Sequence, residues 1–104
     1  MIPQISPENA IELIGSSTQF VDIRDPDSFV SAHIKNARHL DQTSLPTFLA
    51  DIPLNTQIVV YCYHGHSSLS ATEFLLEQGY KDVSSLQGGF EFWRQRFPET
   101  LTPE

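Results

Sequence analysis

Short apolar segments alternate along this chain with helix-start signals, and that pattern is typical of a parallel sheet covered by helices. Ser6 followed by Pro7 predicts a capped helix start, and Gly15 predicts the end of this first helix. Residues 20–23, three of which are apolar, then predict a short strand. The order of elements in this first part of the chain already favours an α/β fold.

The middle of the chain repeats the same signals. Asp25 and Pro26 form a second cap-and-proline pair and predict a second helix. Residues 37–40 predict a brief strand, and one or two helical turns closed by Pro53 are predicted by the apolar residues Leu45, Phe48 and Leu49.

The most apolar strand is predicted over residues 57–61, where Ile58, Val59 and Val60 follow one another without polar alternation. Such a strand is covered on both faces and belongs in the middle of the sheet, which places Cys62 at its carboxyl end. Residues 67–78 predict a helix that Gly79 ends as a left-handed cap. Apolar residues lie around most of its wheel, so this helix is expected to be buried: Leu69, Ala71, Phe74, Leu75 and Leu76.

The last part of the chain predicts a strand over residues 83–86 and a tight turn at Gly88 and Gly89. An apolar stripe at helical spacing follows and is expected to join the core: Phe90, Trp93 and Phe97. The tail from Glu99 is expected to fray. Residues 1–104 are therefore expected to form one domain.

Composition excludes several classes of function. The 104 residues hold 13 acidic and six basic side chains, a net charge of -7, which argues against nucleic acid and anionic lipid as partners. A single cysteine cannot form an internal disulfide, and no apolar stretch approaches the roughly 20 residues of a membrane span. The first residues lack the pattern of a signal peptide, so the reducing cytoplasm is the expected compartment.

Candidate chemistry is concentrated in residues 59–68, where a buried strand enters a short loop that opens a helix. Ligands bind beyond the carboxyl ends of parallel strands, and backbone N–H groups at a helix start attract anions. Cys62 at this position is expected to ionise more readily than a free thiol and to act as a nucleophile. Ser67 and Ser68 can add hydroxyl donors, and Gly65 is expected to hold a backbone angle that side chains resist.

Other interpretations of these residues are structural. A lone cysteine often only fills space in a core. Tyr63, His64 and His66 can be plain exposed loop residues, and a metal site is disfavoured because no nearby Cys or His pair completes a set of four ligands.

Several polar residues outside the loop are expected to be framework residues. Asp25 already serves as a helix cap, and Asp22 and Arg24 are expected to pair with each other. His33 and His39 are expected to make structural hydrogen bonds rather than to act as acids or bases.

Several segments together resemble the rhodanese family, and they span most of the chain: residues 21–25, Phe29, residues 33–34, Ala37, residues 62–68, residues 86–90 and Trp93. The similarity is greatest to its short single-domain thiosulfate sulfurtransferases. This resemblance implies a three-layer α/β/α fold around a five-stranded parallel sheet. It also implies that Cys62 carries sulfur and that the following loop binds substrate: Tyr63, His64, Gly65, His66 and Ser67.

The activity that the resemblance implies is transfer of the outer sulfur of thiosulfate through a persulfide on Cys62. Cyanide would accept the sulfur in vitro, and a small thiol or a dithiol protein such as thioredoxin in the cell, with no metal or organic cofactor. Many family members carry arginine or lysine in the active loop, whereas this loop has none. Weak binding of thiosulfate is therefore expected.

Two rival functions would use a similar anion-binding loop or the same fold. Cysteine phosphatases and arsenate reductases use a Cys-x5-Arg loop, in which the arginine binds the oxyanion. Here Ser68 stands six residues after Cys62, so that arginine is missing. A non-catalytic interaction module would be expected to have lost the cysteine. The oligomeric state is left open by the sequence.

Overall fold

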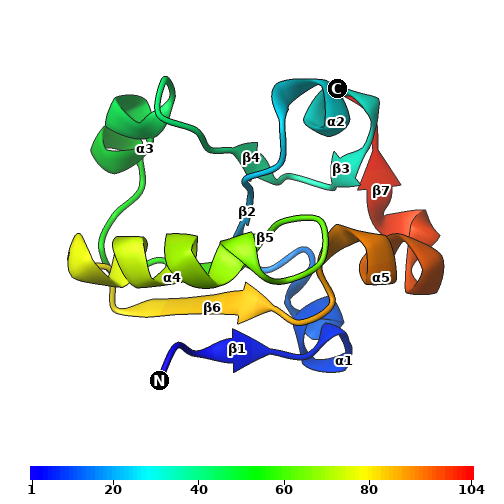
Figure 1. Ribbon diagram of the computed structural model, residues 1–104, viewed down its shortest axis with the longest axis horizontal. Helices are drawn as coiled ribbons and strands as arrows, with labels where there is room; N and C mark the ends of the chain where they lie inside the picture. The colour runs from blue at the N-terminus through cyan, green and yellow to red at the C-terminus, as the bar shows by residue number, and fades with distance from the viewer.

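Five parallel strands form one sheet in the order β1-β6-β5-β2-β4, as the computed structural model of residues 1–104 shows (Figure 1). Their bounds in this order are β1 (Gln4–Ile5), β6 (Asp82–Leu86), β5 (Gln57–Tyr61), β2 (Gln19–Asp22) and β4 (Arg38–His39). All neighbouring pairs are parallel. The expected five-stranded parallel sheet is confirmed, with β5 in its centre, although β1 had no clear signal in the sequence.

The first two helices begin where the cap signals at Ser6 and Asp25 predicted. Their bounds are α1 (Pro7–Ala10), α2 (Pro26–Ser31), α3 (Leu45–Asp51), α4 (Ser67–Glu77) and α5 (Gly89–Arg96), with 3-10 turns η1 (Ile11–Leu13) and η2 (Pro98–Thr100). The Ser6 hydroxyl accepts from the Asn9 amide at 3.1 Å, and the Asp25 carboxylate accepts from the Ser28 amide at 3.1 Å. None of the helices is both long and apolar enough to cross a bilayer.

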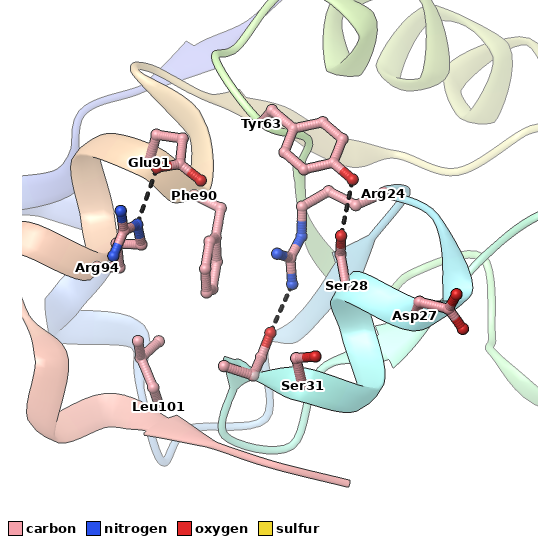
Figure 2. Close-up of a pocket in the computed structure, with 10 residues that line it drawn as sticks. Arg24, Asp27, Ser28, Ser31, Tyr63, Phe90, Glu91, Arg94 and Leu101 are labelled. Atoms are coloured by element: carbon pink, nitrogen blue, oxygen red, sulfur yellow. Dashed lines mark hydrogen bonds and ion pairs between the residues drawn. The ribbon is translucent and has the colours of Figure 1, made fainter.

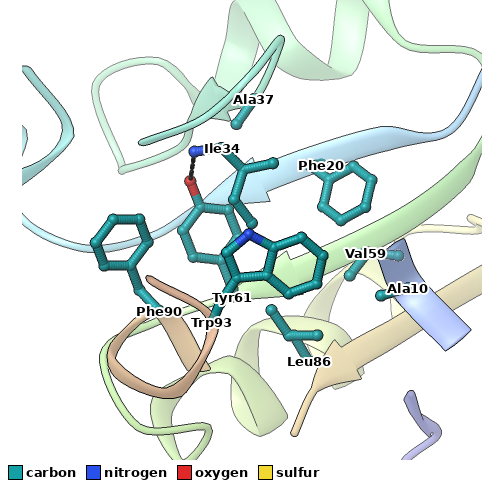
Figure 3. Packing of buried hydrophobic residues seen from close by; sticks show 9 residues of the cluster. All are labelled: Ala10, Phe20, Ile34, Ala37, Val59, Tyr61, Leu86, Phe90 and Trp93. Carbon is teal, nitrogen blue, oxygen red and sulfur yellow. Dashed lines mark hydrogen bonds between the residues drawn. The ribbon is translucent and has the colours of Figure 1, made fainter. Parts of the chain in front are cut away.

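Two apolar cores lie on opposite faces of the sheet, because successive side chains of β5 point to opposite sides. Ile58 and Val60 face the core under α3 and α4, which also contains Phe48 and Leu75. The other core lies under α1 and α5 and centres on Trp93 (Figure 3); it is made of Ala10, Phe20, Ile34, Ala37, Val59, Tyr61, Leu86, Phe90 and Trp93. This gives the expected three layers.

Helix α4 differs from the sequence prediction of an all-round buried helix. Only Ser68, Thr72 and Leu75 of this helix are buried, and 38% of Phe74 is exposed. Two polar residues thus occupy the inward stripe, and the Thr72 hydroxyl donates to the Ser68 carbonyl at 2.7 Å. The apolar count around the wheel was misleading because buried hydroxyls can replace apolar groups when they are hydrogen-bonded.

The expectation of a frayed tail from Glu99 is wrong. Strand β7 (Leu101–Thr102) pairs antiparallel with β3 (His33–Ile34) in a second, two-stranded sheet. Buried Thr100 anchors the turn before β7, because its hydroxyl accepts from the Trp93 indole at 2.8 Å. Figure 1 shows the red terminal strand lying beside β3.

A buried ion pair joins β2 to the segment that follows it. Arg24 donates to the Asp22 carboxylate at 2.7 Å and to the Ala32 carbonyl at 2.6 Å, and both charged side chains are almost fully buried. The expected pairing is confirmed. His33 and His39 are hydrogen-bonded as expected, to the carbonyls of Phe29 and Arg24.

The buried pair predicts a large loss of stability when one partner is removed. Arg24→Met should lower the free energy of unfolding by about 3–5 kcal/mol, because the buried Asp22 carboxylate loses its partner. Arg38→Met is the control, since the Arg38–Asp51 pair lies at the surface, with 34% and 52% of the two side chains exposed, and should contribute less than about 1 kcal/mol. Urea unfolding followed by Trp93 fluorescence measures both variants, and equal losses would contradict the argument.

Candidate active site around Cys62

Cys62 lies just beyond the carboxyl end of the central strand β5. The alternation that turns Ile58 and Val60 toward α4 places Cys62 on the same side of the sheet. The residue is only 4% exposed, and its thiol is free. A loop of four residues then leads directly into α4, so the sulfur lies beneath the start of that helix.

Two backbone amides and one hydroxyl lie within hydrogen-bond distance of the Cys62 sulfur. The amides of Gly65 and Ser68 each donate to Sγ at 3.2 Å, and the Ser68 hydroxyl lies 3.3 Å from it. The loop can turn back in this way because Gly65 adopts a φ of +94°, as its position predicted. The first turn of α4 has no side-chain cap, which leaves its amides available to the sulfur.

The charge state of Cys62 is set by two opposing effects. Burial of the thiol raises its pKa, because the thiolate loses hydration. Hydrogen bonds from the Ser68 hydroxyl and from the amides of Ser68 and Gly65, with a smaller contribution from the His64 amide, favour the thiolate and together outweigh burial. The pKa of Cys62 is therefore lower than that of an ordinary thiol, which favours a nucleophilic sulfur at neutral pH.

A cavity of about 200 Å³ opens above the sulfur, and it is lined by Cys62, Tyr63, His64, His66 and Ser67. These are the residues that the sequence indicated, and Gly65 adds its amide to the sulfur. The two histidines and Ser67 are exposed. No lysine or arginine lines this cavity, so an anion there meets only neutral donors unless a histidine is protonated.

Tyr63 forms the wall between this cavity and a larger one of about 400 Å³ (Figure 2). Its hydroxyl is hydrogen-bonded to Ser28 at 2.8 Å and to Asp25, which ties the ring to the start of α2. Arg24 lines the larger cavity, where its guanidinium stacks on Phe90 at 3.8 Å. The buried cation near the site, Arg24, therefore lies behind Tyr63, and its guanidinium is already held by Asp22 and Phe90.

The turn at Gly88 and Gly89 supports the active loop from behind. The amide of Phe90 donates to the Cys62 carbonyl at 2.8 Å, and the amide of Glu91 donates to the Tyr63 carbonyl at 3.0 Å. A Cβ atom at Gly89 would lie 2.7 Å from the His64 amide nitrogen, closer than side-chain atoms approach. The sequence predicted this turn, but its contact with the loop depends on the tertiary fold.

One feature of the site was missed by sequence reasoning. Ser85 on β6 is buried and hydrogen-bonded to Ser68 at 2.7 Å. Strand β6 holds two adjacent serines, Ser84 and Ser85, and only its register beside β5 shows which of them faces Ser68. No group of three or more His, Cys, Asp or Glu side chains is placed to hold a metal ion.

Comparisons with known proteins agree with this geometry. The family model described as "Rhodanese-like domain" matches residues 6–96. The thiosulfate sulfurtransferase GlpE of Stutzerimonas stutzeri is 50% identical over 94% of this chain and 90% of its own length. The protein of the same name from Pseudomonas aeruginosa strain LESB58 is 48% identical over 91% of this chain and 86% of its own length.

A solved structure supports the fold. The rhodanese-like domain from Anabaena superimposes with a TM-score of 0.83, at 21% identity, over 100% of this chain and 81% of that one. At this identity the likeness shows the architecture alone, and it agrees with the three layers described above.

The close contact of Gly89 with the active loop predicts that a substitution there changes the ionisation of the Cys62 thiol. In Gly89→Ala the new methyl group should displace the backbone at Tyr63 and His64 and move the amides away from the sulfur. The rate of alkylation by iodoacetamide reports the thiolate of Cys62 alone, because the chain has one cysteine. Its pH profile should move to higher pH in this variant.

Gly15→Ala is the matched control for that experiment. Gly15 also has a positive φ, of +83°, but a Cβ there meets nothing within 4 Å. Its alkylation profile should stay at the wild-type position. An unchanged profile in Gly89→Ala would show that the turn does not hold the loop.

Proposed function

Because this chain belongs to the rhodanese family, we propose that it is a thiosulfate sulfurtransferase that carries the transferred sulfur on Cys62. The observation that carries the proposal is the convergence of two amides and one hydroxyl on a buried sulfur at the floor of a small cavity. Such a site stabilises negative charge on sulfur and has room for a small anion.

The first half-reaction is a displacement at sulfur. The Cys62 thiolate attacks the outer sulfur of thiosulfate, the new S–S bond forms, and the old S–S bond breaks. Sulfite leaves with the electron pair of the broken bond, and a Cys62 persulfide anion remains, so the total charge of -3 is the same on both sides. His64, His66 and Ser67 line the cavity in which the oxyanion part of thiosulfate would lie.

The second half-reaction returns the enzyme to its thiolate. A nucleophile attacks the outer persulfide sulfur, and Cys62 leaves as the thiolate; cyanide then yields thiocyanate. A thiol or a dithiol protein of the thioredoxin type is the acceptor that we propose for the cell. The single free cysteine suits a reducing compartment, and the cytoplasm is our proposal for it.

A phosphatase or arsenate reductase is the less favoured alternative. Those enzymes bind the oxyanion with an arginine at the end of the active loop. Here the corresponding residue is Ser68, which is buried and hydrogen-bonded to the Cys62 sulfur. No arginine lines the cavity above Cys62.

The test of the proposal is the mass of the protein after reaction with thiosulfate. The reduced chain should gain one sulfur atom, and cyanide should remove it and release thiocyanate. Cys62→Ser should not gain sulfur, and its thiosulfate:cyanide activity should fall at least about a thousandfold, because a serine hydroxyl is rarely ionised.

Ser67→Ala is the control, since it removes an exposed hydroxyl of the same cavity and keeps the nucleophile. It should still gain one sulfur atom. Full activity in Cys62→Ser would remove Cys62 from the mechanism, and hydrolysis of phosphate esters without any sulfur gain would favour the alternative enzyme class.

A second prediction follows from the lack of a fixed cation in the cavity. The net charge of -7 repels thiosulfate over distances that salt shortens to about 10 Å at 0.1 M, whereas the loop amides act at contact. The value of kcat/KM should therefore stay level or rise modestly as an inert salt is added. His64→Arg and His66→Arg should each lower KM about threefold at neutral pH and make the rate fall with salt.

Gln78→Arg controls for net charge in the salt series. It adds the same charge at an exposed position at the far end of α4 and should leave KM almost unchanged. A steep loss of wild-type kcat/KM with added salt would mean that a cation already guides the substrate. Equal KM changes in all three variants would show that net charge, rather than the cavity, decides affinity.

A further inference from the structure

Three elements bring their polar side chains together behind the active loop. Cys62 follows β5, Ser68 lies in the first turn of α4, and Ser85 lies on β6 beside β5. The Ser68 hydroxyl oxygen lies 3.3 Å from the Cys62 sulfur and 2.7 Å from the Ser85 hydroxyl oxygen. The three side chains therefore form one continuous hydrogen-bonded chain.

The position of Ser85 is one where an apolar residue would be expected. Val60 is its partner in the register of β5 and β6, and Val83 lies on the same face of β6. Ser85 is 1% exposed and Ser68 is 0% exposed. A hydroxyl buried at this depth costs stability unless it is hydrogen-bonded, and Ser68 is the partner of the Ser85 hydroxyl.

The direction in which these hydrogen bonds are donated must change with the charge of the Cys62 sulfur, since each hydroxyl has one proton. When Cys62 is a thiol, its S–H can donate to Ser68, and Ser68 can donate to Ser85. When Cys62 is a thiolate, the sulfur only accepts, so Ser68 turns its proton toward the sulfur. The Ser68 oxygen is then free to accept the proton of Ser85.

We propose that Ser85 is a positioning residue for sulfur transfer, whose hydroxyl donates to Ser68 and thereby aims the Ser68 proton at the negatively charged Cys62 sulfur. The inference rests on the proposed function and adds a residue outside the active loop to it. Hydrogen bonds in a buried chain polarise one another, so the bond from Ser85 strengthens the bond from Ser68 to the sulfur. The Ser68 hydroxyl is one of the groups that lower the pKa of Cys62.

Other titratable or charged groups near Cys62 lie outside the chain of hydroxyls. His64, His66 and Tyr63 line the cavity above the sulfur, and the Arg24 guanidinium lies 5.8 Å from the Tyr63 ring. The Ser85 side chain does not line this cavity, and its hydrogen-bond partner, Ser68, is uncharged. A substitution at Ser85 therefore changes the hydroxyl chain without changing any of these charges.

The test is the pH profile of Cys62 alkylation by iodoacetamide in Ser85→Ala. The profile should move to higher pH because the thiolate loses support, and kcat/KM for thiosulfate should fall about fivefold, as for the loss of one neutral hydrogen bond. Ser85→Thr keeps the hydroxyl and should keep the wild-type alkylation profile. An alkylation profile in Ser85→Ala that matches wild type would overturn the proposal.

Ser84→Ala is the matched control, because Ser84 is the same residue type on the same strand but pairs in register with Val59 and faces the other core. It should leave both the profile and kcat/KM unchanged. An equal shift in Ser84→Ala would mean that any loss of a hydroxyl from β6 disturbs the site, and it would overturn the proposal.

A double variant tests whether Ser85 acts through Ser68. Ser68→Ala should shift the profile by itself, and Ser68→Ala combined with Ser85→Ala should shift it no further. Additive shifts would show that Ser85 acts by another route and would overturn the proposal. Alkylation needs no sulfur transfer, so its outcome for the serine chain is separate from the outcome of the mass experiment for the proposed function.

Discussion

The site depends on one constraint: several backbone N–H groups must point at a single sulfur. A loop of four residues can do this only if its backbone reverses, which Gly65 allows, and only if it is held in place from behind. Gly89 provides that support, because its lack of a side chain lets the start of α5 reach the loop backbone. The Trp93 core holds α5 against the sheet, so the packing of one apolar core sets the geometry of the thiolate site.

The Cys62 sulfur is surrounded by neutral hydrogen-bond donors, whereas the buried positive charge of Arg24 is used elsewhere in the fold. Arg24 is the cation nearest to the active loop among the buried residues, but Asp22 and the Ala32 carbonyl take its donors, and Phe90 covers its face. The sulfur is therefore stabilised by neutral groups that are fixed in position and need no counterion. Neutral donors act at contact and are little affected by salt, whereas they attract a distant anion weakly. A sulfurtransferase built in this way gains a stable thiolate and gives up long-range attraction of its substrate.

Local signals in the sequence predicted most of the fold and the centre of the site. The caps at Ser6 and Asp25, the unbroken apolar run of β5 and the position of Cys62 all follow from neighbouring residues, and the structure has them. Pairing of β7 with β3 could not be predicted in the same way, since the partners lie far apart in the chain and neither is strongly apolar. The inward stripe of α4 was misjudged because its burial depends on hydroxyl partners that only the tertiary structure supplies.

The role of Ser85 could not be predicted from the sequence because it depends on the register of β6 beside β5. Its place beside Val60 depends on the parallel pairing of β5 with β6, and a shift by one residue would turn its hydroxyl into the opposite core. A valine at this position would fill the same space and remove the need for a buried hydrogen bond, so packing alone does not favour serine. The same holds for Ser68 on the facing stripe of α4, where leucine or alanine would suit a helix better. Two buried hydroxyls that meet only each other and the Cys62 sulfur are best understood as structure retained for the chemistry of that sulfur.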